Sequence, residues 1–398
     1  MKGLKEAPGF SALSEEYLFA ETTKRIREAE ASLGRRVARL GMGDVSHPLT
    51  PTVCRALTEA AREMGGEATR RGYSPIGGYG FLRAAAREAY AAEGVDLREE
   101  EIYISDGAKG ELSLIASLLA PDTLHLIPDP AYPAYRDLSS LLGREILFLP
   151  GREEDRFLAM PPEKLLRPAL IFLTSPSNPT GEAYDEAGLA AWIDYAAESG
   201  SILLFDGAYA DFCGKGRPRS ILSLPGARRC CVEIRSFSKG AGFTGLRCGT
   251  TVIPEEVCLG DSRPLAERYR RAVDTLKNGV AYPVQRAAEA ALSPAGRRET
   301  AVTVARYRQN AGLLREALTA AGAAFSGGWD APYLFLRAPG GRSGWELFDF
   351  FLGAGIAVTP GEGFGNAGRG YVRLSALAPR RDIEIAAALL PDLLGSLG

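Results

Sequence analysis

Apolar residues between positions 101 and 255 occur in short continuous runs rather than in an alternating apolar and polar pattern. Strands buried on both faces have this pattern, and they are typical of parallel sheets covered by helices on each side. Segments of helical character lie between the runs, at residues 108–119, 131–142 and 185–199. This alternation predicts an α/β fold with a mostly parallel central sheet and helices on both faces. The predicted strands cover residues 101–105, 123–128, 170–174, 201–206 and 231–235.

The flanking segments predict a second, smaller α/β domain. Its expected elements are helices at 14–32, 298–322 and from about 381, and strands at 333–336 and 371–374. A chain of 398 residues is longer than one compact core usually holds, which also favours two domains. We expect a large domain over residues 45–285 and a small domain made of residues 1–44 and 286–398.

Composition limits the classes of function. Hydrophobic content of 46% and charged content of 24% are ordinary for a soluble globular protein. A net charge of -2 offers no electrostatic reason to expect nucleic acid or a membrane surface as a partner. The six cysteines lack the spacing of a zinc site or a disulfide framework, so we expect reduced thiols in a cytoplasmic protein. With only His47 and His125 in the chain, we expect no metal site.

The segment 234–247 places one lysine among serine and glycine residues, with an arginine eight positions later. The amine of Lys239 can condense with the aldehyde of pyridoxal 5'-phosphate (PLP), while Ser236, Ser238 and Arg247 can bind its phosphate. The glycines let the backbone turn and approach a ligand closely. Taken alone, the segment is also compatible with a basic, glycine-rich loop between two strands.

Two polar motifs directly follow predicted strands, where ligands bind in open α/β sheets. Asp206 ends an apolar run and can pair with a protonated pyridine nitrogen, which keeps the ring an electron sink. The alternative for Asp206 is a helix N-cap. Asn178, in the proline-containing turn 174–181, and Tyr209 can hydrogen-bond the phenolic oxygen of the cofactor. The alternative for this turn is chain reversal alone.

Three further positions have chemistry that suits a phosphorylated aromatic cofactor and a carboxylate substrate. Gly107, Ala108 and Lys109 lie at a strand-to-helix junction, which can bind phosphate or simply begin a capped helix. Tyr132 follows a turn and can stack on a flat ring or be an ordinary buried aromatic. Arg373 lies inside an apolar strand, where a guanidinium needs an anionic partner from either a substrate or the protein.

The order of these motifs resembles that of the fold-type I, class I and II PLP aminotransferases over nearly the whole chain. The similarity is greatest to the LL-diaminopimelate aminotransferases, through residues 40–44, 106–109, 235–245, 277–279 and 359–365. The resemblance implies that Lys239 holds PLP covalently and moves a proton, that Asp206 holds the ring nitrogen, and that Tyr132 stacks on the ring. It assigns the phosphate to Gly107, Ala108, Lys109, Ser236, Ser238 and Arg247, and the phenolic oxygen to Asn178 and Tyr209.

The resemblance also implies a homodimer with shared active sites, in which Tyr73 of each subunit reaches the phosphate bound by the other. The substrate-binding residues that it implies are Arg373, Asn178, Tyr17, Asn278, Gly43 and Ile76. The chain departs from the family pattern at three positions. Ile76 stands where these enzymes carry a glutamate that recognises the distal end of the substrate. Thr250 stands in place of a tryptophan, and Glu362 in place of a small residue.

These observations predict a PLP-dependent aminotransferase that moves an amino group between an amino acid and a 2-oxo acid, with an altered substrate pocket. The alternative is a PLP-dependent elimination, replacement or annulation enzyme on the same scaffold. A PLP-binding regulator without enzyme activity is disfavoured, because the chain is not basic and retains every cofactor residue.

Overall fold

The computed structural model describes residues 4, 6–7, 9–13, 18–260 and 262–397. Its larger sheet has seven strands in the order β2-β8-β7-β6-β5-β3-β4. These strands are β2 (Ile102–Ser105), β3 (Leu124–Asp129), β4 (Ile146–Pro150), β5 (Ala169–Thr174), β6 (Ile202–Asp206), β7 (Cys231–Ser236) and β8 (Gly249–Val252). All run parallel except β8, which is antiparallel to both β2 and β7. The prediction of a mostly parallel central sheet is confirmed, whereas β4 and the antiparallel β8 were not predicted.

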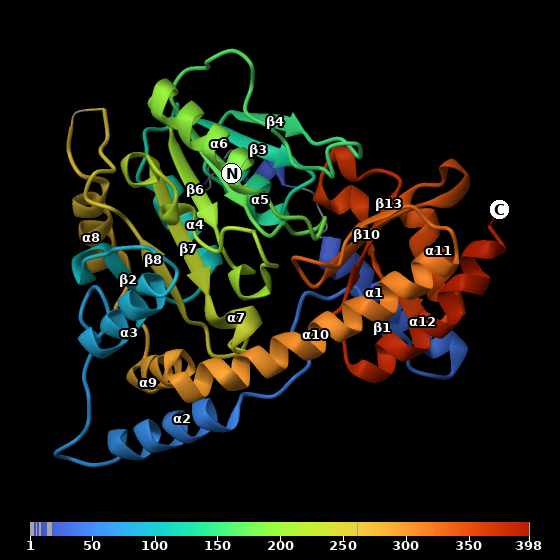
Figure 1. Cartoon of the computed structure of the whole chain (residues 1–398), viewed down its shortest axis with the longest axis horizontal. Coiled ribbons are helices and arrows are strands. Elements are labelled where there is room, and N and C mark those ends of the chain that lie inside the picture. Colours follow the sequence, from blue (N-terminus) through green and yellow to red (C-terminus); the bar gives the residue numbers. More distant parts are fainter. Residues whose placement is uncertain (1–3, 5, 8, 14–17, 261, 398) are drawn as a thin grey trace.

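Helices cover both faces of this sheet, which explains why its strands are apolar without interruption (Figure 1). Leu170 and Phe172 of β5 pack on one face, and Ile171 and Leu173 pack on the other. The first face is covered by α4 (Ala108–Ser117), α5 (Pro133–Leu141) and α8 (Leu265–Leu276). The second is covered by α3 (Gly80–Ala91) and α6 (Glu186–Ser199). Alternate residues of each central strand are therefore buried on opposite sides.

A smaller antiparallel sheet lies at the other end of the molecule, with the strand order β12-β13-β10-β9. Its strands are β9 (Phe325–Gly327), β10 (Tyr333–Arg337), β12 (Thr359–Pro360) and β13 (Tyr371–Ser375). Beside it, β1 (Ala38–Arg39) pairs with β11 (Ile356–Ala357). A separate hydrophobic core unites this sheet with α1 (Leu18–Leu33), α11 (Gly344–Ala354) and α12 (Arg380–Gly395).

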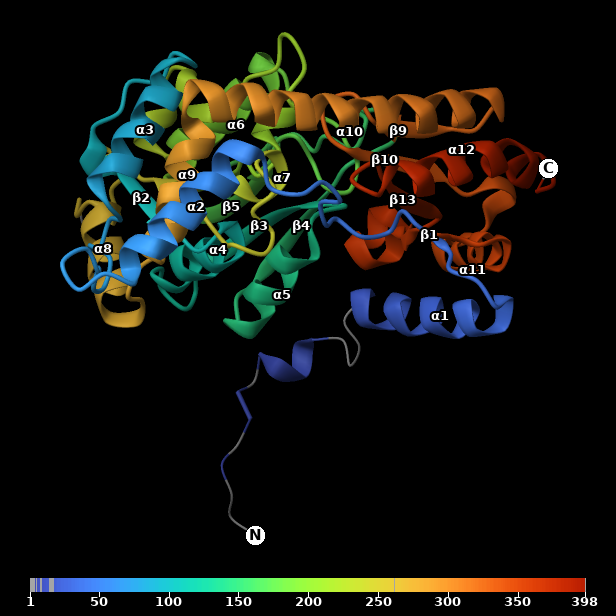
Figure 2. The ribbon, with the colours of Figure 1, turned by 90° about the horizontal axis from the view of Figure 1, so that it is seen from below.

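Helix α10 (Pro294–Ala320) has 27 residues and runs from one end of the molecule to the other, along both sheets (Figures 1 and 2). At 1.5 Å per residue it is about 40 Å long. Its first turns lie beside α2 (Pro51–Met64) and α9 (Tyr282–Leu292), while its last turns pack in the core of the smaller sheet. The domain boundaries given above stay a prediction. Among the described helices, none combines the length and apolarity needed to cross a bilayer.

Candidate active site

A cavity of about 460 Å³ lies where three adjacent parallel strands of the large sheet end. Thr174, Asp206 and Ser236 are the last residues of β5, β6 and β7, and all three line it. Tyr333 of β10 and Arg373 of β13 close it from the smaller sheet. The carboxyl edge of a parallel sheet is the usual binding place in open α/β folds, and this volume suits a cofactor with a small substrate.

Lys239 lies in α7 (Phe237–Gly240), a single helical turn directly after β7. The turn begins with an N-cap, because the Ser236 hydroxyl accepts a hydrogen bond from the Ser238 amide at 3.1 Å. The Lys239 ammonium donates to the carbonyl of Gly43. Within the described residues this lysine has no ion-pair partner, so its amine is held at the cavity wall by a neutral acceptor.

Three elements form a cradle of hydrogen-bond donors beside Lys239. Gly107 precedes α4 with a φ of 101°, a conformation that favours glycine. A Cβ atom at this position would lie 2.5 Å from Nη2 of Arg247, so the arginine side chain packs directly on the glycine. Nη1 of Arg247 donates to the Ser238 hydroxyl at 3.2 Å. This donor set, together with the N-terminus of α4, fits a phosphate dianion.

Asp206, the last residue of β6, is a buried carboxylate that is 5% exposed. Burial raises the pKa of its carboxyl group, and a hydrogen bond from the Tyr135 hydroxyl opposes that rise. Its Oδ2 accepts from Tyr135 at 2.8 Å, and its Oδ1 accepts from the Ala208 amide at 3.0 Å. No cation of the described chain forms an ion pair with it. The site therefore fits a cofactor ring that brings its own protonated nitrogen, and with the donor cradle the residues fit PLP.

Aromatic side chains form the remaining walls. Tyr132 lies edge-on to Tyr135 with ring centroids 5.6 Å apart, and the Lys109 ammonium lies 5.7 Å from the Tyr132 ring centroid. Burial raises the pKa of Tyr132 to about 12, so its hydroxyl stays protonated at neutral pH. The Tyr209 and Tyr333 hydroxyls are hydrogen-bonded to each other at 2.6 Å. Tyr209 lines the cavity as expected, with Tyr333 as an additional partner.

Arg373 is 1% exposed and forms no ion pair within the described residues. Its Nη1 donates to Oδ1 of Asn178 at 2.6 Å, and its Nη2 donates to the carbonyl of Gly41 at 2.7 Å. Its Nε has no hydrogen-bond partner. The guanidinium lies between the rings of Tyr333 and Phe364, at 4.5 and 4.8 Å from their centroids. The sequence left two possible anionic partners for Arg373, a substrate carboxylate or a protein carboxylate. No carboxylate of the described residues pairs with it.

The cavity brings together most of the site residues expected from the sequence. They are Gly43, Ala108, Lys109, Tyr132, Asn178, Asp206, Tyr209, Ser236, Ser238, Lys239, Arg247 and Arg373. Tyr73 and Ile76 do not line it, and they are 83% and 45% exposed on the loop between α2 and α3. Asn278 does not line it either. Tyr17 lies outside the described residues.

None of the three departures from the family pattern lines this cavity in the single chain. Thr250, in β8, lines a different cavity on the far side of β7. The carboxylate of Glu362 accepts a hydrogen bond from the Gly344 amide at 2.7 Å, at the N-terminus of α11. The expectation of an altered substrate pocket therefore requires a second subunit that brings the exposed Ile76 to the cavity.

Some lining residues were not singled out from the sequence, namely Met42, Asp44, Leu112, Tyr135, Thr174, Ala208, Thr244 and Tyr333. The sequence could have indicated Tyr135, because it follows Tyr132 by three residues at the start of α5 and so can lie on the same face of that helix. Nothing in the sequence singles out Tyr333, because an aromatic residue in an apolar strand is usually part of the hydrophobic core.

Comparison with known proteins agrees with this geometry. A family model described as aminotransferase class I and II matches residues 35–390. The chain belongs to this family. It is 39% identical to an LL-diaminopimelate aminotransferase of Desulforapulum autotrophicum, over 99% of this chain and all of the relative. It is also 39% identical to one from Agathobacter rectalis, over 92% and 94% of the two chains. The structure of the L,L-diaminopimelate aminotransferase from Chlamydomonas reinhardtii superposes with a TM-score of 0.91 at 33% identity, covering 99% of both chains.

Class I and II aminotransferases use PLP to move amino groups between amino acids and 2-oxo acids, so the predicted reaction, cofactor and fold-type I architecture are confirmed. The alternative of a PLP-dependent elimination, replacement or annulation enzyme is not favoured by these relatives. The roles of single residues and the dimer stay predictions.

Proposed function

We propose that Arg373 binds the α-carboxylate of both the amino acid and the 2-oxo acid that this aminotransferase interconverts. The observation that carries the proposal is a fully buried guanidinium whose acceptors are all neutral and whose Nε is unpaired. A buried guanidinium gains most from a carboxylate held by two parallel hydrogen bonds. Asn178 would hold Arg373 in place through its amide oxygen while its amide nitrogen remains available to the cofactor.

When bound, PLP supplies an aldehyde for covalent attachment and a ring that withdraws electrons from the substrate α-carbon. Lys239 would anchor it and then move the proton at that carbon. Asp206, fixed by Tyr135, would keep the ring nitrogen protonated. Tyr132 would stack on the ring. The remaining groups would orient the cofactor, with Gly107, Ala108, Lys109, Ser236, Ser238 and Arg247 at the phosphate, and Asn178 and Tyr209 at the phenolic oxygen.

We further propose that LL-diaminopimelate is the amino donor. Both curated relatives bear that name at 39% identity over at least 92% of the chain. Thr250 and Glu362 do not argue against this substrate, because neither lines the cavity. Ile76 cannot accept a hydrogen bond from a distal ammonium group, so recognition of that end would use other residues of the pocket.

The dimer is part of the same proposal. Tyr73, Ile76 and Leu276 are large hydrophobic side chains that are exposed in the single chain, at 83%, 45% and 66%. A second copy that covers them would bring Tyr73 to the phosphate of its partner and would complete the substrate pocket with Asn278, Ile76 and Tyr17. The six free cysteines suit the reducing cytoplasm in which we expect the enzyme to work.

The test of the donor uses PLP-loaded protein and the visible absorbance of the bound cofactor. LL-diaminopimelate, glutamate, aspartate and aromatic amino acids are added one at a time. We expect LL-diaminopimelate to abolish the visible band and 2-oxoglutarate to restore it. A response to the other amino acids but not to LL-diaminopimelate would show that this donor is wrong while leaving transamination intact. In Ile76→Glu, the KM for LL-diaminopimelate should fall about tenfold or more if a distal hydrogen bond is gained, with Ile76→Gln as the uncharged control.

The shared active site is tested by mixing two weakly active variants, Lys239→Ala and Tyr73→Ala. A heterodimer of the two contains one complete site, with Lys239 from one subunit and Tyr73 from the other. We expect activity to reappear after the subunits are allowed to exchange. No recovery, although exchange is shown by mass spectrometry, would rule out sharing of the site.

A further inference from the structure

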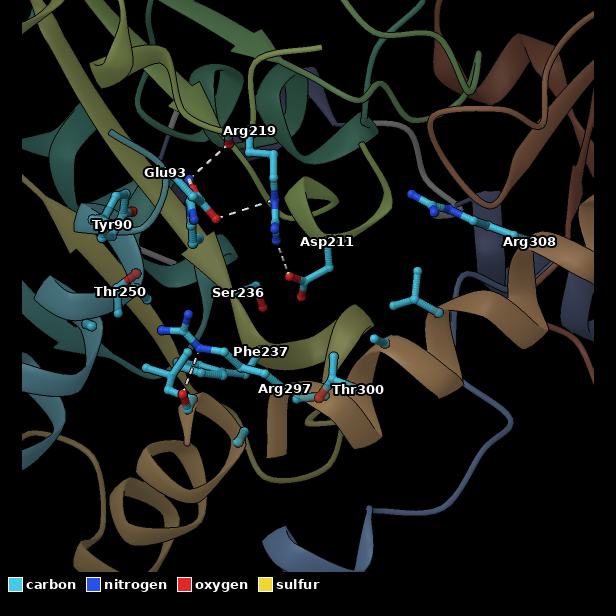
Figure 3. A pocket seen from close by; sticks show the side chains of 18 residues that line it. Tyr90, Glu93, Asp211, Arg219, Ser236, Phe237, Thr250, Arg297, Thr300 and Arg308 are labelled. Carbon is cyan, nitrogen blue, oxygen red and sulfur yellow. Dashed lines mark hydrogen bonds and ion pairs between the residues drawn. The ribbon is translucent and has the colours of Figure 1, made fainter. Parts of the chain in front are cut away.

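A second cavity, of about 280 Å³, lies between α3, the end of β7 and the first half of α10 (Figure 3). Ser236 is the one described residue that lines both this cavity and the active-site cavity, so the two are separated by the end of β7. At about 30 Å³ of liquid volume per water, the second cavity has room for roughly nine waters. It can therefore hold a metabolite-sized molecule.

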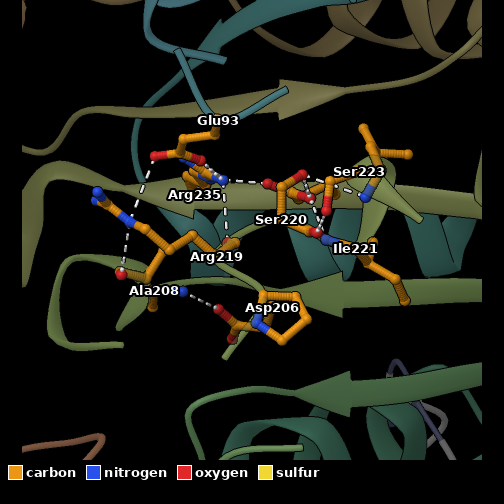
Figure 4. A network of polar contacts seen from close by, with 12 residues as sticks. Glu93, Asp206, Ala208, Arg219, Ser220, Ile221, Ser223 and Arg235 are labelled. Carbon is orange, nitrogen blue, oxygen red and sulfur yellow. Dashed lines mark hydrogen bonds and ion pairs between the residues drawn. The ribbon is translucent and has the colours of Figure 1, made fainter. Parts of the chain in front are cut away.

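On the side of the sheet, the two carboxylates that line the cavity, Glu93 and Asp211, are paired with arginines, and Figure 4 shows Glu93 beside Arg235 and Arg219. Glu93 accepts from Nη2 of Arg235 at 2.6 Å and lies 3.4 Å from Nε of Arg219. Asp211 accepts from Nη2 of Arg219 at 2.8 Å. Arg235 also donates to Glu233 at 2.7 Å. The carboxylates of this wall are thus already neutralised by arginines, so this wall does not favour a cationic ligand.

On the side of α10, the two arginines that line the cavity, Arg297 and Arg308, have no carboxylate partner among the described residues. Residues 297, 300, 301, 304 and 308 all line the cavity, and their spacing places them on one face of the helix. Arg297 reaches from this face into the cavity (Figure 3) and donates from Nε to the Leu292 carbonyl at 2.7 Å. Arg308 donates to two backbone carbonyls. Neither arginine forms an ion pair with any described residue.

Tyr90 and Thr300 also line the cavity, and both have buried hydroxyl groups. Tyr90 is 2% exposed, and its hydroxyl interacts with the side chains of Thr250 and Glu233. Burial raises the pKa of Tyr90 well above its ordinary value, so this hydroxyl is a donor at every relevant pH. The Thr300 hydroxyl, by contrast, has no hydrogen-bond partner among the described residues. Buried polar groups without partners are uncommon and costly, so donors in excess of acceptors indicate a missing acceptor.

Apart from Ser236 and Thr250, the rest of the lining is apolar, from side chains on α3, α9 and α10 and around α7, including Ala86, Ala89, Phe237, Ala291, Leu292 and Val304. Inorganic phosphate would leave these surfaces uncovered. We propose that the second cavity binds a small carboxylate with an apolar body, whose carboxylate pairs with Arg297. This ligand is distinct from the substrates, and its binding does not depend on Arg373.

The test titrates PLP-loaded enzyme with benzoate and hexanoate in a calorimeter, with benzamide as the uncharged analogue of benzoate. We expect at least one carboxylate to bind and benzamide to bind at least about tenfold more weakly, because it cannot form the charged pair. Arg297→Gln should raise the Kd about tenfold or more. Arg298→Gln removes the same charge from the neighbouring exposed position, which does not line the cavity, and should leave the Kd unchanged.

A second pair of variants tests the location without removing a charge. Ala301→Phe places a bulky ring at an exposed position on the cavity wall and should abolish binding. Val302→Phe makes a similar change one residue away, outside the lining, and should have no effect. If binding is the same in Arg297→Gln and Ala301→Phe as in the unaltered enzyme, the carboxylate is held elsewhere and the proposal is wrong. It is equally wrong if neither carboxylate binds.

Discussion

Replacing Gly107 by alanine tests the phosphate cradle most directly, because two features of the structure oppose a side chain there. The residue has a φ of 101°, which L-residues with a Cβ rarely adopt. A Cβ atom would also lie 2.5 Å from Nη2 and 3.0 Å from Cζ of Arg247. Ordinary contacts between such atoms are about 3.5 Å, so the guanidinium must move by roughly 1 Å.

We expect the substitution to weaken mainly the binding of PLP. The backbone strain costs on the order of 1–3 kcal/mol, and it is present in both the apo and the loaded protein. A shift of about 1 Å in Arg247 would break its 3.2 Å hydrogen bond to Ser238 and at least one hydrogen bond to the phosphate. A hydrogen bond to a charged group contributes about 1.5–3 kcal/mol. We therefore expect Gly107→Ala to raise the Kd for PLP by roughly 10- to 100-fold.

The assay titrates apo-protein with PLP and follows visible absorbance, with the thermal stability of the apo-protein measured in parallel. Gly80→Ala is the matched control, because Gly80 begins α3 with open space around the added methyl group and without a positive φ. It should leave the Kd for PLP unchanged. The reasoning fails if Gly107→Ala binds PLP as tightly as the unaltered chain, or if Gly80→Ala weakens PLP binding equally.

Three further predictions follow from single contacts. Arg373→Lys loses the paired geometry for a carboxylate, so KM for both amino acid and 2-oxo acid should rise about 10- to 100-fold in steady-state assays, while the Kd for PLP stays constant. Glu362→Ala removes the acceptor for the Gly344 amide and should lower the free energy of unfolding by about 0.5–2 kcal/mol in denaturant titrations, with KM unchanged. Burial lowers the pKa of His125 to about 4, from 6.5. Between these pH values the unfolded chain binds a proton that the folded chain does not, so stability falls as pH falls, by up to about 3 kcal/mol. In denaturant titrations at several pH values, His125→Gln should make the free energy of unfolding depend less on pH in this range. An unchanged slope would contradict the role assigned to His125.

The arrangement of the large sheet and most of its ligand-binding edge could be predicted from the sequence. Continuous apolarity is required of any strand that is covered on both sides, so the runs ending near Thr174, Asp206 and Ser236 identified the central strands. Polar residues directly after such strands must meet at one edge, because parallel strands end on the same side. Local chemistry was sufficient here, since each motif lies within a few residues of its strand.

The pairings between distant segments were decided only by the tertiary structure. The hydrogen bonds of Tyr135 to Asp206 and of Arg373 to Asn178 join residues that are 71 and 195 positions apart. No local pattern encodes them, because the first depends on how α5 packs on the large sheet and the second on how the two sheets meet. The antiparallel direction of β8 is set by its partners β2 and β7. The placement of Thr250 follows from that pairing, because Thr250 lies opposite Arg235 and directly paired residues share one face of a sheet, where both line the second cavity. The sequence thus determined which residues carry the chemistry, and packing determined what each of them contacts.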